Sequence, residues 1–493
     1  MINRYTLNNP TISIKSDLAA QFPVYLYLSD KKDYLLYSTS IQELLEHKEV
    51  IKPLSVKSES ISFLLQSGIV PLPNTIYKNI FSIGIGDKVT VETIDNKINL
   101  SFEHTFAFKN EQRDKETEID EQYILKLLAD ATSSKLRKGV SSYLFHSAGK
   151  DSNMIALALA EAGYQNQITC ITHQSSGESD ESEISKKIAQ KLGFKHQTLY
   201  LPKKLEKSHL SSINNYFENT PLPCVDNVTL AYPLYNTQID FRGTNIIDGS
   251  GNDVYIGHIP DKSEYSKQKY FSKLHYFRYL TDRFDSSNKL RNLTLTQSEW
   301  AGLSGFSFGD SQSIFKNSYN VYEYWKKADK TREKWDYLDI RADIWGCMVE
   351  SDRVIRKSRN LATLTQANLI LPWCDSEVAN YFSKLPENKL FDRQELKNKL
   401  ILRKMLKEKI GLDSDKIGKM AFTFDFFSIL EMMQKEVQQE IIQCKLWDET
   451  TIKKMLEHLY KNTKINFKNK VLIQRLYLIS AWYNKNRYIK REK

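Results

Sequence analysis

Short apolar runs alternate with helical stretches in the middle of the chain. Residues 143–145 end one apolar run, and residues 154–163 follow it without proline and are rich in Ala and Leu. A short apolar run before small residues is typical of a buried strand in a parallel sheet, and Ala and Leu favour helix. The pattern therefore predicts a strand, a tight turn at 147–152, and a helix that a glycine ends.

The same alternation continues toward the middle of the chain. Apolar runs at 167–172, 196–201 and 244–248 predict three further strands. Asp180 and Glu183 have the spacing of a capping box, which predicts a helix that begins at Asp180. Strands that alternate with helices at this spacing predict an α/β fold with a parallel sheet and right-handed crossovers. In such a sheet we expect the ligand at the carboxyl ends of the strands.

The beginning of the chain has a different pattern. Apolar runs at 24–29 and 34–38 enclose polar turn residues, and the runs at 88–92 and 98–100 do the same. Each pair predicts a β-hairpin. We therefore expect residues 1–112 to form a small, β-rich domain.

The rest of the chain is predicted to be one larger domain. The charged residues 113–119 are expected to be a linker, and residues 120–493 to carry the parallel sheet and a mainly helical carboxyl-terminal part. Within it, residues 258–340 are rich in Tyr, Phe, Lys and Asp and predict a helical insertion. An aromatic and basic mixture can stack on nucleic acid, but such residues more often pack helices together, and helix packing is what we expect.

Composition and charge add limits to this picture. At 493 residues the chain is too long for one ordinary core, which also favours two domains. The net charge of +10 arises from 70 basic and 60 acidic residues mixed along the chain, so it fits a solvated surface and an anionic substrate. No nucleic-acid partner is expected.

The five cysteines include no C-x-x-C pair, which favours a reducing compartment and argues against a zinc site. No uncharged stretch reaches transmembrane length, so we expect no membrane partner and a cytoplasmic location.

Candidate chemistry lies in two glycine-rich turns. The turn at 147–152 reads S-A-G-K-D-S, and it is not a Walker A loop. Backbone N–H groups at the start of the following helix form a binding site for phosphate. Asp151 is suited to bind the Mg²⁺ that accompanies the phosphate. A second turn, D-G-S-G-N-D at 248–253, follows another predicted strand and brings Asp253 close to Asp151. Two neighbouring carboxylates suit a divalent cation that bridges to a triphosphate.

These two turns, in this order, resemble the paired signatures of the asparagine synthetase family, whose first turn is the pyrophosphate-binding loop of the ATP pyrophosphatases. Ala148 stands where that loop usually has Gly. Residues 61–91 are also similar to the tail of the family's amidotransferase domain. Later segments resemble further family motifs in the expected order: 352–353, 371–375, 385–390, 399–403 and 419–422.

The resemblance implies an ATP-pyrophosphatase (PP-loop) synthetase domain after a truncated, glutaminase-like domain. It implies that ATP and its pyrophosphate contact residues from both turns and from the second strand of the sheet. These residues are Ser147, Ala148, Gly149, Asp151, Ser152, Ile171 and Gly249. By the same resemblance, Mg²⁺ is assigned to Asp151 and Asp253, and the catalytic roles are assigned to Lys399 and Lys419.

Departures from the family narrow the expected reaction. No cysteine precedes Cys170, so a glutaminase nucleophile is missing. Ser250 stands where asparagine synthetases have a Glu, and Asn368 matches a Glu that β-lactam synthetases need. These changes point toward the branch that makes amides from larger amines. The closest pattern is that of the lasso-peptide macrolactam synthetases, which join the N-terminal amine of a precursor peptide to an Asp or Glu side chain through an acyl-adenylate. A leader peptidase is the partner that this resemblance implies.

Other functions stay open at this stage. One is an asparagine synthetase-like ligase for a small-molecule carboxylate and amine. Another is a tRNA-modifying ATP pyrophosphatase, which explains the first turn and the charge but not the segments after Asp352. A third is an inactive scaffold, for which Ala148 and Ser250 leave room. The sequence identifies no general base, and the histidines near the site are expected to be structural: His146, His173, His196 and His258.

Overall fold

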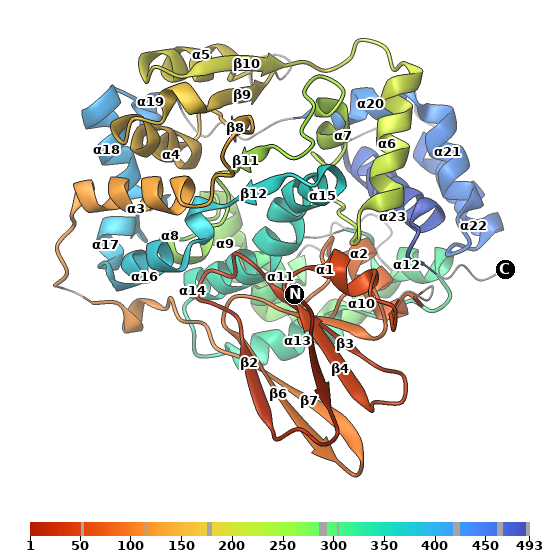
Figure 1. Ribbon diagram of the computed structural model, residues 1–493. Coiled ribbons are helices and arrows are strands. Elements are labelled where there is room, and N and C mark those ends of the chain that lie inside the picture. Colours follow the sequence, from red (N-terminus) through yellow and green to blue (C-terminus); the bar gives the residue numbers. More distant parts are fainter. Residues whose placement is uncertain are drawn as a thin grey trace.

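The computed structural model describes residues 1–493 except 51–53, 115, 175–179, 285–292, 303–304, 418–423, 461–466 and 490–493. The N-terminal strands lie at one end of the molecule, and the parallel sheet lies toward the other with helices packed around it (Figure 1). The fold is therefore mixed α/β, as the alternating pattern predicted.

The centre of the larger part is a five-stranded parallel sheet with the order β10-β9-β8-β11-β12. Its strands are β8 (Ser142–Phe145), β9 (Thr169–His173), β10 (Lys195–Leu199), β11 (Asn245–Ile247) and β12 (Asn368–Ile370). The first four match the predicted strands. The chain after residue 340 is mainly helical, as predicted, and β12 is a strand that the sequence did not predict, because three residues are too short to show a periodicity.

Side chains of the sheet alternate between two cores. Leu144, Cys170 and Ile247 face a core shared with α3, α4 and α18, whereas Ile171 and Ile246 face a core shared with α6, α7 and α23. The helices on the first side are α3 (Glu121–Ser133), α4 (Lys150–Glu161), α5 (Ser182–Lys191) and α18 (Leu400–Ile410). Those on the second side are α6 (Lys207–Asn219), α7 (Ala231–Tyr235), α15 (Ile355–Thr365) and α23 (Phe467–Lys485).

The start of α5 differs from the prediction. The helix begins at Ser182 with Glu181 as its N-cap residue, so the expected capping box at Asp180 is wrong. Asp180 instead accepts a hydrogen bond from the Ser182 N–H at 3.0 Å. The Glu181 carboxylate is used elsewhere: it accepts the backbone N–H of Ala148 at 2.9 Å.

The N-terminal part contains two antiparallel sheets, and both predicted hairpins are confirmed. The strands are β1 (Asn3–Thr6), β2 (Ile12–Lys15), β3 (Val24–Leu28), β4 (Tyr34–Ser38), β5 (Ile80–Ile83), β6 (Asp87–Ile94) and β7 (Lys97–His104). The short helices α1 (Ile41–Leu45) and α2 (Ser58–Gln66) accompany them. Tyr5, Leu26, Leu35 and Val89 form a core between the two sheets.

Helices make up the described part of residues 258–340 and most of the chain after residue 340. After α8 (Asp253–Ile256), which precedes residue 258, the first group is α9 (Lys262–Phe271), α10 (Arg278–Phe284), α11 (Gln297–Ala301), α12 (Phe308–Ile314), α13 (Tyr322–Thr331) and α14 (Tyr337–Ala342). The second is α16 (Ser376–Lys384), α17 (Glu387–Leu390), α19 (Ser414–Ile417), α20 (Phe426–Met432), α21 (Gln434–Gln443) and α22 (Glu449–Tyr460). A two-stranded ribbon consists of β13 (Phe391–Asp392) and β14 (Lys397–Asn398).

The sequence did not predict a π-helix, η6 (Asp343–Val354), which runs directly into α15. Short 3₁₀ turns are η1 (Asn110–Gln112), η2 (Gln165–Gln167), η4 (Ser272–Phe277) and η7 (Pro372–Cys374). All five cysteines are buried and free of disulfides. Within the described residues, no helix combines the length and apolar character that crossing a membrane requires.

An ion-pair network joins the N-terminal strands to η6. His104 Nδ1 lies 2.7 Å from Asp87 Oδ1, and His104 Nε2 lies 2.8 Å from Asp343 Oδ1. Arg332 Nε donates to the other oxygen of Asp343 at 2.7 Å. Asp343 is fully buried, and a buried carboxylate needs such partners to offset the loss of its hydration.

Raising the pH should weaken this network. Burial alone lowers the pKa of His104, but the hydrogen bonds and charges of Asp343 and Asp87 outweigh it and raise the pKa from 6.5 to about 9. The stabilising charge is therefore complete below pH 6.5 and is lost as the pH rises through about 9. We expect the free energy of unfolding, measured in urea, to fall over this range, by less than the full pKa shift would give because solvent screens part of the interaction. In His104→Gln, the free energy of unfolding should depend less on pH than in wild type. Equal pH dependence in the two proteins would contradict this interpretation.

Candidate functional site

The first glycine-rich turn joins β8 to α4 and is held by its own side chains. The Gly149 N–H donates to Ser147 Oγ at 3.0 Å, and the Ser147 N–H donates to Ser152 Oγ at 3.2 Å. Asn153 Nδ2 donates to the carbonyl oxygens of Ser147 and Gly149 at 2.9 and 2.6 Å. Gly149 is the N-cap residue of α4, so the backbone here has the helix-start geometry that favours anions.

The second glycine-rich turn follows β11 and touches the first. A Cβ on Gly249 would lie 3.1 Å from the backbone nitrogen of Ser152, so a larger residue would push the two turns apart. Gly251 has a φ of +115°, and a Cβ there would lie 2.2 Å from the Cys374 sulfur. At both positions, neighbouring atoms lie so close that a side chain larger than that of glycine does not fit without a shift.

A buried lysine connects the two turns. Lys399 Nζ lies 2.6 Å from Asp151 Oδ2 and 3.1 Å from Asp253 Oδ1. It also donates to Asn252 Oδ1 at 3.0 Å, and Asn252 Nδ2 donates to Asp151 Oδ1 at 2.6 Å. Burial alone lowers the pKa of Lys399, but the two carboxylates outweigh it and raise the pKa. The structure therefore brings together Asp151, Asp253 and Lys399 in one charged cluster.

A cavity of about 260 Å³ opens beside this cluster. It is lined by the two turns, the ends of β8, β9 and β10, helix α7, and the junction of η6 with α15. The lining residues are Phe145, His146, Ser147, Gly149, Asp151, Ser152, Ile171, His173, Leu199, Tyr232, Tyr235, Asp248, Gly249, Ser250, Val354 and Lys357. The cavity thus lies at the carboxyl ends of the parallel strands, where the sequence predicted the ligand.

Most of the predicted binding residues line this cavity, and the others are placed differently. Ala148 is buried, and its N–H is bonded to Glu181. Asp253 and Lys399 lie in the charged cluster beside the cavity. Lys419 lies outside the described residues.

The histidines of the cavity are held neutral at neutral pH. Burial lowers the pKa of His146 to about 4, and its ring nitrogens lie 2.7 Å from Ser185 Oγ and 3.0 Å from Asn153 Oδ1. Burial also lowers the pKa of His173 to about 4. The contacts of His146 agree with the structural role that the sequence predicted.

Sequence reasoning missed Glu350, which lies on η6 behind the second turn. Its Oε1 accepts the Gly251 N–H at 2.6 Å, and its Oε2 is buried without a hydrogen-bond partner among the described residues. Burial, followed by the charge of Asp253, raises the pKa of Glu350. The available signal was one acidic residue directly after the apolar run 344–349, because an acidic residue next to a buried apolar run is uncommon unless it has a partner.

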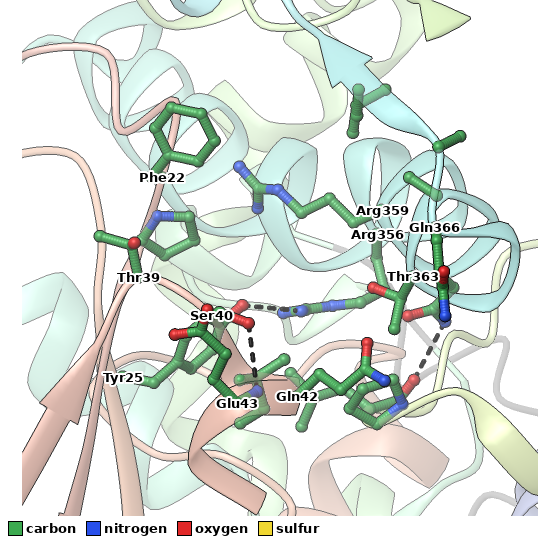
Figure 2. Close-up of a pocket in the computed structure, with 18 of the residues that line it drawn as sticks. Phe22, Tyr25, Thr39, Ser40, Gln42, Glu43, Arg356, Arg359, Thr363 and Gln366 are labelled. Atoms are coloured by element: carbon green, nitrogen blue, oxygen red, sulfur yellow. Dashed lines mark hydrogen bonds between the residues drawn. The ribbon is translucent and has the colours of Figure 1, made fainter. Parts of the chain in front are cut away.

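A larger cavity of about 500 Å³ lies on another side of α15 (Figure 2). Tyr25, Arg356 and Arg359 line it, and the Arg356 side chain reaches the Tyr25 hydroxyl at 3.2 Å. Asn368, which matches a family Glu, also lines this cavity, and its amide donates to Asn245 Oδ1 at 2.8 Å. Neither glycine-rich turn contributes to this cavity, so we place the functional site in the smaller one.

Removing the ammonium group of Lys399 should destabilise the protein. In Lys399→Met, the carboxylates of Asp151 and Asp253 lose their shared cation. We expect the free energy of unfolding to fall by about 2–4 kcal/mol, measured by urea denaturation. Lys404→Met is the control, because Lys404 forms an exposed ion pair with Glu121 that solvent screens. Equal stability of Lys399→Met and wild type would show that the cluster does not hold the two turns.

Comparisons with known proteins identify the family. Residues 123–484 match the family described as asparagine synthase. A Methanocaldococcus jannaschii protein that carries the name glutamine-hydrolyzing asparagine synthetase 2 is 22% identical over 237 residues, which is 48% of this chain and 44% of that relative. The match thus spans less than half of the relative's length. Because the family match covers most of the chain, this protein belongs to the asparagine synthase family.

Proposed function

We propose that this protein joins a carboxylate to an amine through an acyl-adenylate, with release of AMP and pyrophosphate. The observation that carries the proposal is the contact of Lys399 with both Asp151 and Asp253, beside a cavity that both turns line. The family supports it, since asparagine synthases are ATP-dependent carbon–nitrogen ligases, the enzyme class predicted from the sequence.

The reaction has two steps. A carboxylate is a poor acyl donor because oxide would have to leave, so its oxygen first attacks the α-phosphorus of ATP. The bond from the α-phosphorus to the bridging oxygen breaks, and pyrophosphate leaves. The amine nitrogen then attacks the acyl carbon, the bond to AMP breaks, and the amine loses a proton.

The first turn is suited to the departing pyrophosphate. Ser147 and Ser152 offer hydroxyl groups at the start of α4, where backbone N–H groups favour anions. Asp151 and Asp253 are hard oxygen donors held side by side, so they would hold Mg²⁺, whose charge offsets that of the phosphates. Ile171 and Gly249 are the proposed contacts of adenosine. Lys419 is the proposed stabiliser of the tetrahedral intermediate.

The finer proposal is macrolactam closure of a lasso precursor peptide. Ser250 lines the cavity and donates from Oγ to Asp248, so this position offers no carboxylate as a general base. Asn368 is not among the residues that line it. Both features fit an amine that positioning alone brings to the acyl carbon. Residues 1–112 contain no cysteine, which fits a degenerate glutaminase-like domain that does not release ammonia. A leader peptidase is the proposed partner.

Asp151→Asn should abolish activation of the carboxylate. We expect exchange of labelled pyrophosphate into ATP, driven by Asp- or Glu-containing acids, to fall by about 100-fold or more, because fixed charge near the phosphates dominates this step. EDTA should have the same effect on wild type, and added Mg²⁺ should reverse it. Asp130→Asn, an exposed change on α3, is the control. Exchange that survives in Asp151→Asn would point to a different site, and no exchange in wild type would support the inactive-scaffold alternative.

The amine and acid can be identified by offering different substrates. With ATP, a precursor core peptide that carries an Asp or Glu should lose one water in mass, and its N-terminal amine should become unreactive to acylating reagents. Aspartate with ammonia, and tRNA, should release no pyrophosphate above background. Amide formation from aspartate and ammonia would favour the small-molecule ligase, and pyrophosphate release with tRNA would favour the tRNA-modifying alternative.

A further inference from the structure

Lys357 gives the cavity a positive charge that no predicted motif contains. It lies on α15 and is the one Lys or Arg among the described residues that line the cavity. His146 and His173, which also line it, are neutral at neutral pH because burial lowers their pKa to about 4. A cavity that receives anions therefore has one described cationic side chain on its wall.

The charge of Lys357 is only partly matched by the protein. Lys357 Nζ lies 3.1 Å from Asp226 Oδ1, and Arg353 Nε lies 2.8 Å from Asp226 Oδ2. One carboxylate thus serves two cations. The side chains of Asp226 and Lys357 are 8% and 11% exposed, so water screens this surplus charge poorly. Arg353 alone is sufficient to neutralise Asp226.

The other carboxylates of the cavity are engaged with other groups. Asp248 accepts from Ser250 Oγ at 2.7 Å and from the Ser358 hydroxyl, and Asp151 is paired with Lys399 at 2.6 Å. In the part of the chain that the structure describes, Asp226 is the carboxylate within ion-pair distance of Lys357. An anion that enters the cavity can therefore form an ion pair with Lys357 while Asp226 remains paired with Arg353.

We propose that Lys357 binds the carboxylate of the acid substrate and, after adenylation, the carbonyl oxygen of the acyl-adenylate. This inference rests on the proposed function. Attack of a carboxylate on the α-phosphate brings two anions together, so a cation that is not held by the pyrophosphate lowers the repulsion between them. In the proposed function, the two turns and Lys399 interact with the phosphates. Lys357 lies on a different element, α15, so it is available to the acid substrate. Ser250, which replaces a carboxylate-bearing residue of the family, leaves the acidic group to be supplied by the substrate.

The test compares two ligands that differ in the acyl group. One is AMP, and the other is 5′-O-(N-acetylsulfamoyl)adenosine, a stable mimic of an acyl-adenylate. Their dissociation constants are measured by calorimetry for wild type, Lys357→Gln, Lys357→Arg and Arg353→Gln. Arg353→Gln is the matched control, because Arg353 shares Asp226 but does not line the cavity.

Lys357→Gln should bind the acyl mimic about 10- to 100-fold more weakly, because it loses one charge-assisted hydrogen bond. Its affinity for AMP should change by less than about 3-fold. Lys357→Arg should restore most of the affinity for the mimic. Arg353→Gln should weaken binding of the mimic less than Lys357→Gln does, because it removes no ligand contact and only leaves Asp226 to pair with Lys357. Its affinity for AMP should change by less than about 3-fold.

Three outcomes would overturn the inference alone. The first is an unchanged affinity of Lys357→Gln for the mimic, and the second is an equal loss of affinity for AMP and for the mimic. The third is a loss of affinity for the mimic in Arg353→Gln as large as that in Lys357→Gln. The second would assign Lys357 to the phosphate, and the third would give it only a role in the structure. If wild type bound neither ligand, the proposed function would fail, and this inference would fail with it.

Discussion

The ion pairs of one buried lysine fix the geometry of the site. Lys399 lies at the N-cap of α18 with a φ of 58°, a left-handed conformation that is unfavourable for a residue with a side chain. Burying an ammonium group is expensive unless carboxylates surround it, so Asp151 and Asp253 must both reach Nζ. This requirement ties the two turns and α18 to each other at the edge of the sheet.

The same cluster is not neutral by itself. Glu350 adds a third carboxyl group behind the second turn, and burial together with the charge of Asp253 raises its pKa. The carboxyl groups of Asp151 and Asp253 therefore share one ammonium group, and the Glu350 carboxyl group lies buried behind them. Glu350 also holds the Gly251 N–H, and its position on a π-helix is typical of sites where helix geometry is adapted to function. The cluster thus combines a fixed backbone with surplus negative potential, which suits a divalent cation better than an anion.

The sequence predicted what local patterns determine. The strand, turn and helix around residues 142–161 are explained by a short apolar run, small residues and an Ala-rich helix, and the second turn is explained by its own glycines. The three-residue β12 and the π-helix have no such local signature, because neighbouring strands and helices determine them. Lys357 was missed for the same reason: an isolated lysine in a helix is usually solvated, and only the fold shows that it faces the cavity.

The helix that runs from η6 into α15 connects the N-terminal sheets to the site. On one side, Asp343 pairs with His104, and Asp352 accepts the Val70 N–H at 2.9 Å. On the other, Glu350 holds the second turn, and Lys357 lines the cavity. The N-terminal residues therefore need no chemistry of their own to matter, because their contacts position the helix whose other face shapes the cavity.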